Sequence, residues 1–174
     1  MQKSKRALFR AIQELLEEKE FDKITVQMIL DRAEVSKSTF YNHFLDKYDL
    51  MNQFFSRYID SLLRKGEKGE TYKRAEDTLY FIYEHRVFFK HALKTHGDNN
   101  FFDYMAKYYC EKYIEFFTCD KGSVSDIDLT AIIFYSYGVA YVIKDWVIND
   151  CKMSIAVLTE QIRSYIPPQI PPHY

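Results

Sequence analysis

The sequence predicts an all-α fold of about nine helices, and three observations lead to this class. All four prolines lie within residues 167–172, so proline interrupts no helix before that tail. Only five glycines occur among 174 residues, so strong helix breakers are rare. Apolar residues recur every three or four positions along most of the chain, which is the period of an amphipathic helix.

The first fifty residues have the pattern of short, capped helices. Apolar pairs from Ala7 to Leu16 mark one face of the first helix. The expected elements are, in order, a helix over residues 4–19, a connection at 21–24, a helix from the N-cap Thr25 to Ala33, a turn at Glu34 and Val35, and a helix from the N-cap Ser36 to about Phe44. Asp46 and Asp49 resemble a capping pair for a longer helix over about 47–64.

The rest of the chain predicts further helices separated by polar breaks. The charged, glycine-bearing stretch 65–71 is the best boundary between an N-terminal and a C-terminal part. The expected elements after it are a helix around residues 75–82, a shorter helix to about Thr95, a break at 96–98, a helix around 102–116, a loop at 119–123, a helix over 126–150, a last helix from the N-cap Ser154 to Ile166, and an extended tail over 167–174. The helix over 126–150 is apolar on most sides, so it has to be buried on more than one side.

Residues 25–44 fit a helix-turn-helix, in which two short helices are joined by a tight turn. Ile29 and Val35 would hold the two helices together, and Phe40 and Phe44 would face the same core. The side chains that remain on the outer face are Lys37, Ser38, Thr39, Tyr41, Asn42 and His43. They offer donors, acceptors and a cation, which suits the major groove of DNA. The alternative is a short solvated helix in a bundle.

Residues 24–50 resemble the DNA-binding domain of TetR-type transcriptional regulators. The resemblance covers about residues 4–50 and rests on the motif Val-Ser-x-x-Thr-Phe-Tyr-x-His-Phe, which begins at Val35 and is followed by Asp46-Lys47. The run Asp-Lys-Tyr-Asp-Leu at 46–50 looks most like the branch that includes DhaS, a regulator of the dihydroxyacetone-kinase operon. The C-terminal part is similar to that branch more loosely, through the pairs at 137–138 and 146–147 and the capped last helix.

The resemblance implies roles for individual residues in DNA binding. Residues 36–43 would be the recognition helix, and the positions that face DNA are Lys37, Ser38, Thr39, Asn42 and His43. Tyr41 matches a tyrosine that usually reaches phosphate, and Lys47 matches a lysine that opens the fourth helix, again toward phosphate. Thr25 would cap the preceding helix and lie near the DNA backbone. Phosphate contacts position such a protein, whereas contacts to base edges specify sequence.

Two positions depart from the family pattern. Leu30 stands where a small residue, typically alanine, is common, and Glu34 stands where the turn often has glycine. A residue other than glycine in a left-handed conformation costs about 1 kcal/mol. The turn can tolerate that cost, and neither change touches the outward face.

Aromatic residues make up 17% of the chain and crowd the middle of the C-terminal part. One hypothesis is an effector pocket whose tyrosine hydroxyls anchor a ligand. The residues that we expect to line it are Tyr80, Tyr83, Phe88, Phe102 and Tyr109. The alternative is an aromatic-rich core with half-exposed tyrosines.

The two C-terminal helices are the candidates for self-association, because their apolar surface exceeds what one side of a core requires. Gly138 would let another helix approach closely. In the resembling family the last two helices pair with their copies, and a two-fold dimer then presents two recognition helices to a palindromic operator. The expected interface residues are Tyr135, Gly138, Val142, Trp146, Leu158 and Ile162. The alternative is an intrachain hairpin.

Several classes of function find no support in the sequence. The three cysteines are widely spaced, and neither Cys-x-x-Cys nor a helical histidine spacing typical of metal sites occurs. Catalytic serine motifs and phosphate-binding glycine loops do not occur either, so we expect no enzyme, metal or cofactor. The N-terminus is no secretory signal, and the longest uncharged run, 129–143, is shorter than a bilayer requires. A cytoplasmic protein without membrane contact is therefore expected.

The net charge of −1 hides a segregated pattern. Residues 1–10 carry four basic side chains and no acidic one, whereas residues 11–22 carry five acidic side chains and one lysine. The basic start of the first helix would be available to phosphate. We therefore expect a binder that relies on a few placed contacts.

These observations lead to one principal hypothesis. It is an all-α protein with a three-helix helix-turn-helix DNA-binding domain over 1–48, a helical regulatory and dimerisation domain over 49–166 and a proline-rich tail over 167–174. It would bind double-stranded DNA as a homodimer, under the control of a small-molecule effector or a co-regulator protein. Repression is the family default, and the DhaS branch includes an activator. The alternatives are a helical co-regulator that does not bind DNA, and a small helical enzyme or ligand carrier.

Overall fold

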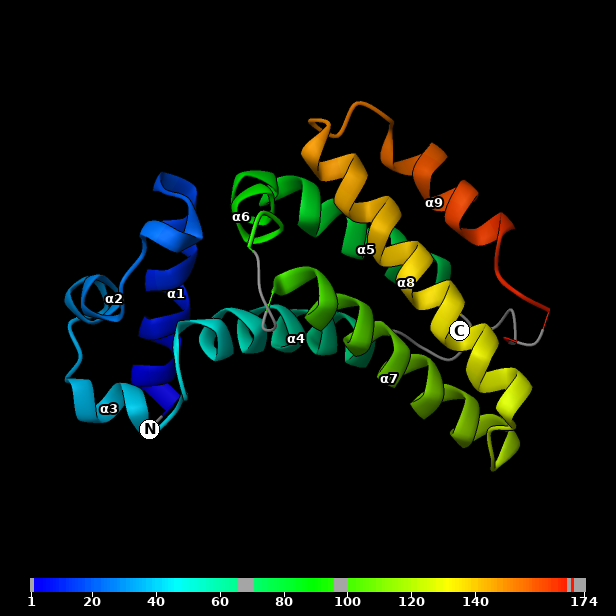
Figure 1. The fold of residues 1–174 in the computed structure, drawn as a ribbon, viewed down its shortest axis with the longest axis horizontal. Helices are drawn as coiled ribbons and strands as arrows, with labels where there is room; N and C mark the ends of the chain where they lie inside the picture. The colour runs from blue at the N-terminus through cyan, green and yellow to red at the C-terminus, as the bar shows by residue number, and fades with distance from the viewer. Residues whose placement is uncertain (1, 66–70, 96–99, 169, 171–174) are drawn as a thin grey trace. The chain divides into compact units, whose positions relative to one another are not determined.

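A computed structural model describes residues 2–65, 71–95, 100–168 and 170 (Figure 1). The described residues form nine α-helices and one short 3-10 helix, which confirms the predicted all-α class. Their bounds are α1 Gln2–Glu18, η1 Phe21–Lys23, α2 Val26–Ala33, α3 Lys37–Tyr41, α4 Lys47–Lys65, α5 Thr71–Glu84, α6 Arg86–Ala92, α7 Phe101–Lys121, α8 Asp126–Ile148 and α9 Ile155–Ser164. The predicted break at 96–98 and most of the loop at 65–71 and of the tail lie outside the described residues.

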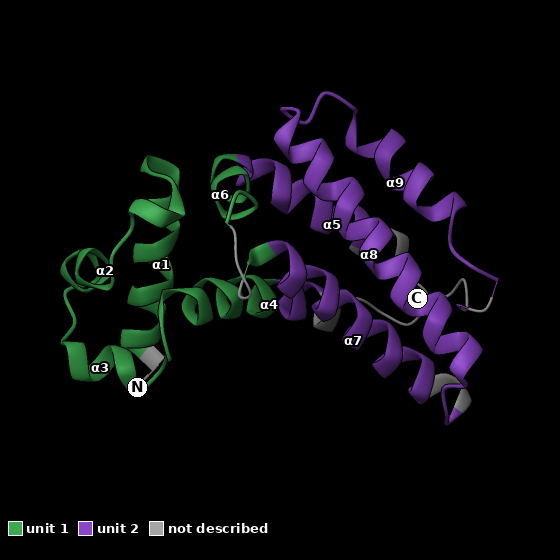
Figure 2. Cartoon of the chain, in the orientation of Figure 1, with its two compact units in different colours: residues 1–58, 87–101 green, residues 59–86, 102–174 purple. Residues whose placement is uncertain are grey.

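The chain forms two compact units (Figure 2). Unit 1 consists of residues 1–58 and 87–101, and unit 2 consists of residues 59–86 and 102–174. Unit 1 therefore contains α1 to α3, most of α4 and nearly all of α6. The units are defined by compactness, so the domain boundaries predicted at residues 48 and 166 stay predictions.

The core of unit 1 is built largely from phenylalanine. Phe40 and Phe44 are buried, with ring centroids 5.8 Å apart, and Phe44 meets the edge of Phe9 at 5.5 Å. The segment 87–101 completes this core, since Phe88 lies 5.2 Å from Phe54 and Phe101 lies 5.3 Å from Phe55. A hydrogen bond of 2.6 Å between the His91 ring and the Leu16 carbonyl also ties α6 to α1.

Capping residues set the helix starts as predicted. Thr25 caps α2, Ser36 caps α3, and the Asp46 carboxylate accepts a hydrogen bond from the Asp49 amide at 2.8 Å. Three predicted ends were wrong: α3 ends at Tyr41 instead of about Phe44, α7 continues through Lys121 where a loop from 119 was expected, and α9 ends at Ser164 instead of Ile166. Helix α7 ends directly before Gly122, and Pro167 lies three residues after the end of α9, whereas neither glycine nor proline closely follows α3.

Helix α8 is the central apolar helix of unit 2. It begins with a capping box between Ser125 and Asp128, and it buries Ile132, Tyr135 and Trp146 within the unit. Among the described helices, α8 alone is long and apolar enough to be compared with a membrane span. Because these residues pack into the unit, it serves here as a core helix, while several apolar side chains on its other side stay exposed.

Candidate functional site

The turn between α2 and α3 is a Schellman motif centred on Glu34. The Val35 amide donates to the Leu30 carbonyl at 3.2 Å, and the Glu34 amide donates to the Asp31 carbonyl at 3.4 Å. Glu34 has φ 53° and ψ 44°, so this non-glycine residue takes the left-handed conformation that the position requires. The side chain of Glu34 is exposed and Leu30 is buried, so both departures from the family pattern fit the helix-turn-helix.

Helix α3 and the turn after it present one polar surface. Lys37, Ser38, Tyr41 and Asn42 are exposed, and the side chain of Tyr41 is 50% accessible. Phe40 faces the core between them with no accessible surface. The short helix therefore shows solvent a cation, a hydroxyl, a phenol and an amide, which are groups that contact phosphates and base edges.

Two residues expected on that surface are only partly available. Thr39 is half-buried, and its hydroxyl lies 2.9 Å from that of the N-cap Ser36. His43 is half-buried, and its Nε2 lies 3.2 Å from the Ser4 hydroxyl on α1. Their polar atoms thus also support the local fold. Thr25 is exposed at the start of α2, where its hydroxyl accepts a hydrogen bond of 3.2 Å from the Met28 amide.

Lys47 has a role inside unit 1 that its sequence position did not reveal. Its Nζ donates to the carbonyls of Phe21 at 3.0 Å and Ile24 at 2.8 Å, and it lies 4.5 Å from the centre of the Phe21 ring. Partial burial lowers the pKa of its ammonium group, while Asp22 and Asp46 oppose that change. Lys47 therefore fastens η1 to the start of α4, whereas its expected phosphate contact stays a prediction.

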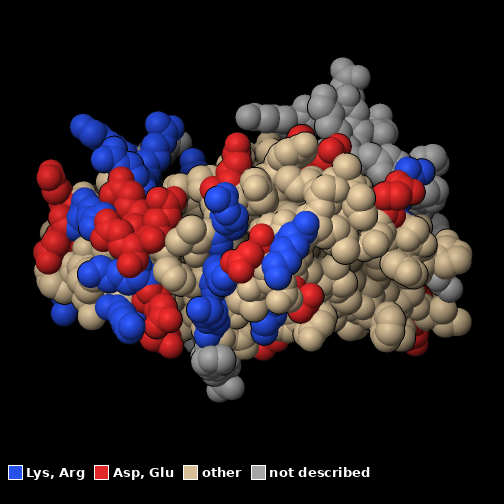
Figure 3. All heavy atoms as spheres, turned by 90° about the horizontal axis from the view of Figure 1, so that it is seen from above, with Lys and Arg blue, Asp and Glu red and all other residues tan. Residues whose placement is uncertain are grey.

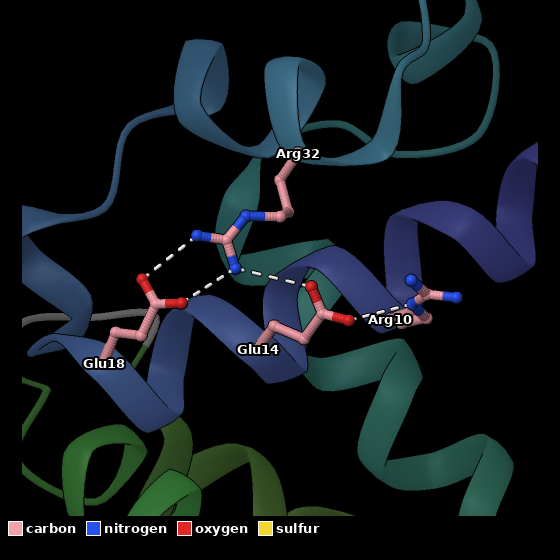
Figure 4. A network of polar contacts seen from close by, with 4 residues as sticks. All are labelled: Arg10, Glu14, Glu18 and Arg32. Atoms are coloured by element: carbon pink, nitrogen blue, oxygen red, sulfur yellow. Dashed lines mark hydrogen bonds and ion pairs between the residues drawn. The ribbon is translucent and has the colours of Figure 1, made fainter.

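A network of ion pairs joins α1 to α2 (Figure 4). Arg32 contacts Glu18 at 2.9 Å and Glu14 at 3.4 Å, and Glu14 also pairs with Arg10 at 2.8 Å. Hydrogen bonds from the arginines lower the pKa of both carboxyl groups. The acidic half of α1 is thus used to hold α2. The segregated charge of α1 was the available signal in the sequence, but it did not identify Arg32 as the partner.

The basic start of α1 is only partly free for phosphate. Lys3 and Arg6 are exposed, but Lys5 donates a hydrogen bond of 2.8 Å to Gln53. Lys5 also lies 5.2 Å from the centre of the Phe44 ring. On the face that Figure 3 shows, clusters of basic and acidic side chains lie next to one another. DNA binding would therefore depend on a few cations near α1 and α3.

Unit 2 contains a mainly apolar cavity of about 130 Å³. Its wall is formed by Ile59 on α4, by residues of α5, α7, α8 and α9, and by Ile166 just after α9. The lining residues are Ile59, Ala75, Thr78, Leu79, Tyr108, Tyr109, Lys112, Tyr113, Phe116, Tyr135, Val139, Ile143, Thr159, Ile162, Arg163 and Ile166. Burial raises the pKa of Tyr113 to about 12 and raises that of Tyr109 further. Both phenols are therefore harder to ionise than an exposed tyrosine.

Of the five residues predicted for an effector pocket, Tyr109 lines this cavity and the other four do not, so an effector site at those four stays a prediction. Tyr80 and Tyr83 are 51% and 40% exposed on α5. Phe88 belongs to the core of unit 1, and Phe102 lies beside Tyr137 with ring centroids 6.4 Å apart. The sequence showed an excess of aromatics but not which side of each helix they occupy.

The predicted dimer residues also divide into two groups. Tyr135, Trp146 and Leu158 are buried and Ile162 is half-buried within unit 2, which leaves them little surface for a partner, and their place in an interface stays a prediction. Gly138 and Val142 are exposed on α8. The same helix exposes Phe134 at 83% and Tyr141 at 61%. An all-apolar helix gives no periodic signal, which explains why the buried and exposed sides were confused.

Comparison with known proteins gives family matches over most of the chain. A model described as bacterial regulatory proteins of the tetR family matches residues 8–54. A model described as the C-terminal region of transcriptional regulators matches residues 69–167. No curated protein gives a significant match.

Two solved structures share the fold across nearly the whole chain. The dihydroxyacetone kinase operon activator DhaS has a TM-score of 0.68 and 18% identity, with 96% of each chain covered. A TetR-family transcriptional regulator from Syntrophomonas wolfei has a TM-score of 0.60 and 18% identity, with 94% of this chain and 93% of that chain covered. At such identity the likeness concerns the fold.

Proposed function

Because the chain belongs to the TetR family of bacterial regulatory proteins and is a transcriptional regulator, we propose that it binds a palindromic DNA operator as a homodimer. The observation that carries this proposal is the exposed polar surface of α3. Lys37, Ser38, Tyr41 and Asn42 are held on a short helix that is capped at its start and anchored by the buried Phe40. Such a helix can enter the major groove without rearranging its core.

The residues on that surface divide into two roles. Lys37 and Tyr41 would contact phosphates and set the position of the helix, because a cation and a phenol suit the DNA backbone. Asn42, with Ser38, would contact base edges, since an amide can pair with adenine through two hydrogen bonds. Thr39 and His43 would contribute only through atoms that their intrachain contacts leave available.

The exposed side of α8 supports the homodimer. Ile127, Phe134 and Tyr141 lie seven residues apart, which places them on one side of the helix, and all three are more than half exposed. Gly138 lies on α8, and a Cβ added there would meet no described atom within 4 Å. The described part of the protomer therefore leaves room for a side chain at this position. A glycine here would instead allow a second helix to approach closely. A two-fold partner fits this surface.

The cavity in unit 2 supports control by an effector. A ligand changes operator affinity only if it binds the DNA-competent and DNA-incompetent states with different affinity. We propose repression by operator occupancy as the main activity, in the cytoplasm. Activation is the second candidate, and the fold match to a protein named as an operon activator supports it.

The test is binding of the full chain to DNA from upstream of its own gene. A mobility-shift titration should show saturable binding. When the titration is repeated at several salt concentrations, the logarithm of the association constant should fall with the logarithm of the salt concentration, with a slope of about −0.9 per neutralised phosphate. Binding that is unsaturable, or equal on unrelated DNA, would favour a co-regulator that does not bind DNA specifically.

A further inference from the structure

His43 lies at the end of the proposed DNA-binding surface, and both its backbone and its ring have defined contacts. Its amide donates to the Phe40 carbonyl at 2.9 Å, which continues the turn after α3. Its half-buried ring lies 6.1 Å from the buried ring of Phe44. The imidazole is therefore held at the edge of the surface, and its chemistry depends on what each ring nitrogen meets.

The Nε2 atom of that ring meets Ser4, which lies in the first turn of α1. The Ser4 hydroxyl oxygen is 3.2 Å from Nε2, although the two residues are 39 positions apart in the sequence. The next residue, Lys5, donates to Gln53 at 2.8 Å, and Gln53 donates to Asp49 at 2.8 Å. The start of α1 is thus tied to α4, so an anchored backbone presents the hydroxyl to His43.

The other nitrogen of the ring, Nδ1, has no hydrogen bond to any residue that the structure describes. A neutral imidazole carries one N–H and one lone pair, and the partner of one nitrogen decides the role of the other. When the Ser4 hydroxyl donates to Nε2, the ring proton is on Nδ1, which then becomes a donor. DNA offers acceptors for this donor in the phosphate oxygens and in N7 and O6 of guanine.

We propose that Ser4 is a positioning residue for operator binding: it holds Nε2 of His43, so that the imidazole donates to the DNA through Nδ1. The shared chemistry of the two possible acceptors, a phosphate oxygen and a guanine edge, is a hydrogen bond from Nδ1–H. The inference rests on the proposed function in one respect, because it requires the α3 surface to contact an operator. The tautomer of His43 in the free protein does not depend on DNA.

Two variants of His43 separate the roles of its ring nitrogens. The amide nitrogen of asparagine can occupy roughly the position of Nδ1, and that of glutamine roughly the position of Nε2. His43→Asn should therefore keep a donor toward the DNA, whereas His43→Gln should keep only the contact with Ser4. In operator titrations of the full chain, His43→Asn should bind at least about 3-fold more tightly than His43→Gln. Equal affinities, or tighter binding by His43→Gln, would overturn the assignment of Nδ1.

Single-base operator variants then identify the acceptor. A loss in His43→Gln that is the same for every sequence assigns a phosphate oxygen, and a loss confined to operators with one particular guanine assigns that base. Both results support the inference, because Nδ1 is the donor in each case.

Variants of Ser4 test the positioning role. Ser4→Ala should weaken operator binding by about 3- to 10-fold, because one orienting hydrogen bond is lost. Ser4→Thr is the matched control, since it keeps the hydroxyl and should restore most of the affinity. In the His43→Asn background, Ser4→Ala should have little effect, because asparagine has no atom at the Nε2 position. An equal loss in both backgrounds would show that Ser4 acts without His43 and would overturn the role.

Nuclear magnetic resonance of the full chain without DNA reports the tautomer directly. The ring nitrogen shifts of His43 are measured at about pH 8.5, where a neutral imidazole predominates. The wild type should show the Nδ1–H tautomer, and Ser4→Ala should shift the population toward Nε2–H. A wild-type ring that is mainly Nε2–H would overturn the inference even if operator binding is normal. If no operator binds, the proposed function fails, whereas an Nδ1–H tautomer that depends on Ser4 would still support the positioning of the ring.

Discussion

Arg32 on α2 donates to Glu18 on α1 from both ends of its guanidinium group, with Nη1–Oε1 at 2.9 Å and Nη2–Oε2 at 3.0 Å. The two parallel hydrogen bonds fix the orientation of the arginine as well as its position. Since α2 leads directly into the Glu34 turn and α3, this pair connects the first helix to the proposed DNA-binding surface. It gives the acidic half of α1 a structural purpose that net charge alone does not indicate.

Replacing Arg32 should weaken operator binding more than it lowers stability. The pair is partly exposed, so its contribution to unfolding is small. Arg32→Lys keeps the charge but loses the two-pronged geometry, so α2 should be held less firmly. We expect operator affinity to fall several-fold with little change in melting temperature. Arg163→Lys is the control, because Arg163 also forms an ion pair, with Glu160 at 3.3 Å, but lies on α9 in unit 2; an equal loss of affinity in both variants would contradict this role.

The same network predicts how stability depends on pH. The hydrogen bond from Arg32 lowers the pKa of Glu18 below its ordinary value of 4.5, so the folded state binds the proton more weakly than the unfolded state does. The stabilisation is therefore present above about pH 4.5 and is lost as pH falls through the lower folded-state pKa. Glu18→Gln should flatten the fall in melting temperature below pH 4.5. An unchanged pH profile would show that other carboxylates dominate.

Substitutions on α3 should separate positioning from specificity. Tyr41→Phe should weaken all operator variants by a similar factor, because a phosphate contact carries no sequence information. Asn42→Ala should reduce the operator-binding free energy by about 1–3 kcal/mol and weaken the preference for one base at the pair that Asn42 contacts. Affinities for a set of single-base operator variants measure both effects. Identical affinity profiles for the two variants would show that the division is wrong.

Glu34 offers a direct test of backbone strain. Its φ of 53° is a left-handed conformation in which a β-carbon is unfavourable, and its side chain is exposed. Glu34→Gly should therefore stabilise the folded state by about 1 kcal/mol, measured by chemical denaturation. Glu34→Ala keeps the β-carbon and should give no such gain. If the two variants are equally stable, any gain comes from removing the charge of Glu34 and not from relieving backbone strain.

We expect Lys47 to contribute more to the stability of the folded protein than to its affinity for DNA. Lys47→Met removes hydrogen bonds to two carbonyls, at 2.8 Å and 3.0 Å, and should destabilise the protein by about 1–3 kcal/mol. Lys23→Met is the control, since the Lys23 side chain is exposed and forms an ion pair at 3.3 Å with the exposed Glu20. If Lys47→Met lowers operator affinity without lowering stability, the lysine acts through phosphate, as its position in the family motif predicts.

The dimer surface can be tested on α8. Phe134 is 83% exposed, so Phe134→Glu should leave the protomer folded while placing a charge in the interface. Dimer dissociation should increase by about 30-fold or more, as sedimentation at several concentrations would show. Tyr80→Glu is the control, because Tyr80 is 51% exposed and lies on α5, so the variant adds the same charge to another helix. Unchanged association of the Phe134 variant would exclude this side of α8.

The sequence was most informative where local chemistry decides the structure. Thr25, Ser36 and Asp46 marked helix starts because a side-chain acceptor beside free amides is a local signal. The motif around α3 predicted a DNA-binding surface through its resemblance to TetR-type regulators, and that assignment stays a prediction. Pairings over long distances had no such signal: the position of Lys47 on the carbonyls of Phe21 and Ile24 depends on the folded path of the chain.

The C-terminal part was harder to predict because α8 is apolar on nearly every side. Periodicity assigns buried and exposed sides only when the two differ in polarity. Trp146 and Phe134 therefore looked equivalent, although one donates its indole N–H to the Met153 carbonyl inside unit 2 and the other is exposed. For the same reason Tyr109 was placed in a pocket together with four aromatics that lie elsewhere.

The discontinuity of unit 1 has a consequence for protein engineering. Residues 1–58 emerge from the ribosome well before Phe88, Phe89 and Phe101, which are fully buried in the same core. A gene fusion that carries only the first 58 residues would leave Phe54 and Phe55 without these partners and expose apolar surface. A transplantable DNA-binding module would have to include residues 87–101, so exchange between relatives should succeed more readily with both segments than with the N-terminal segment alone.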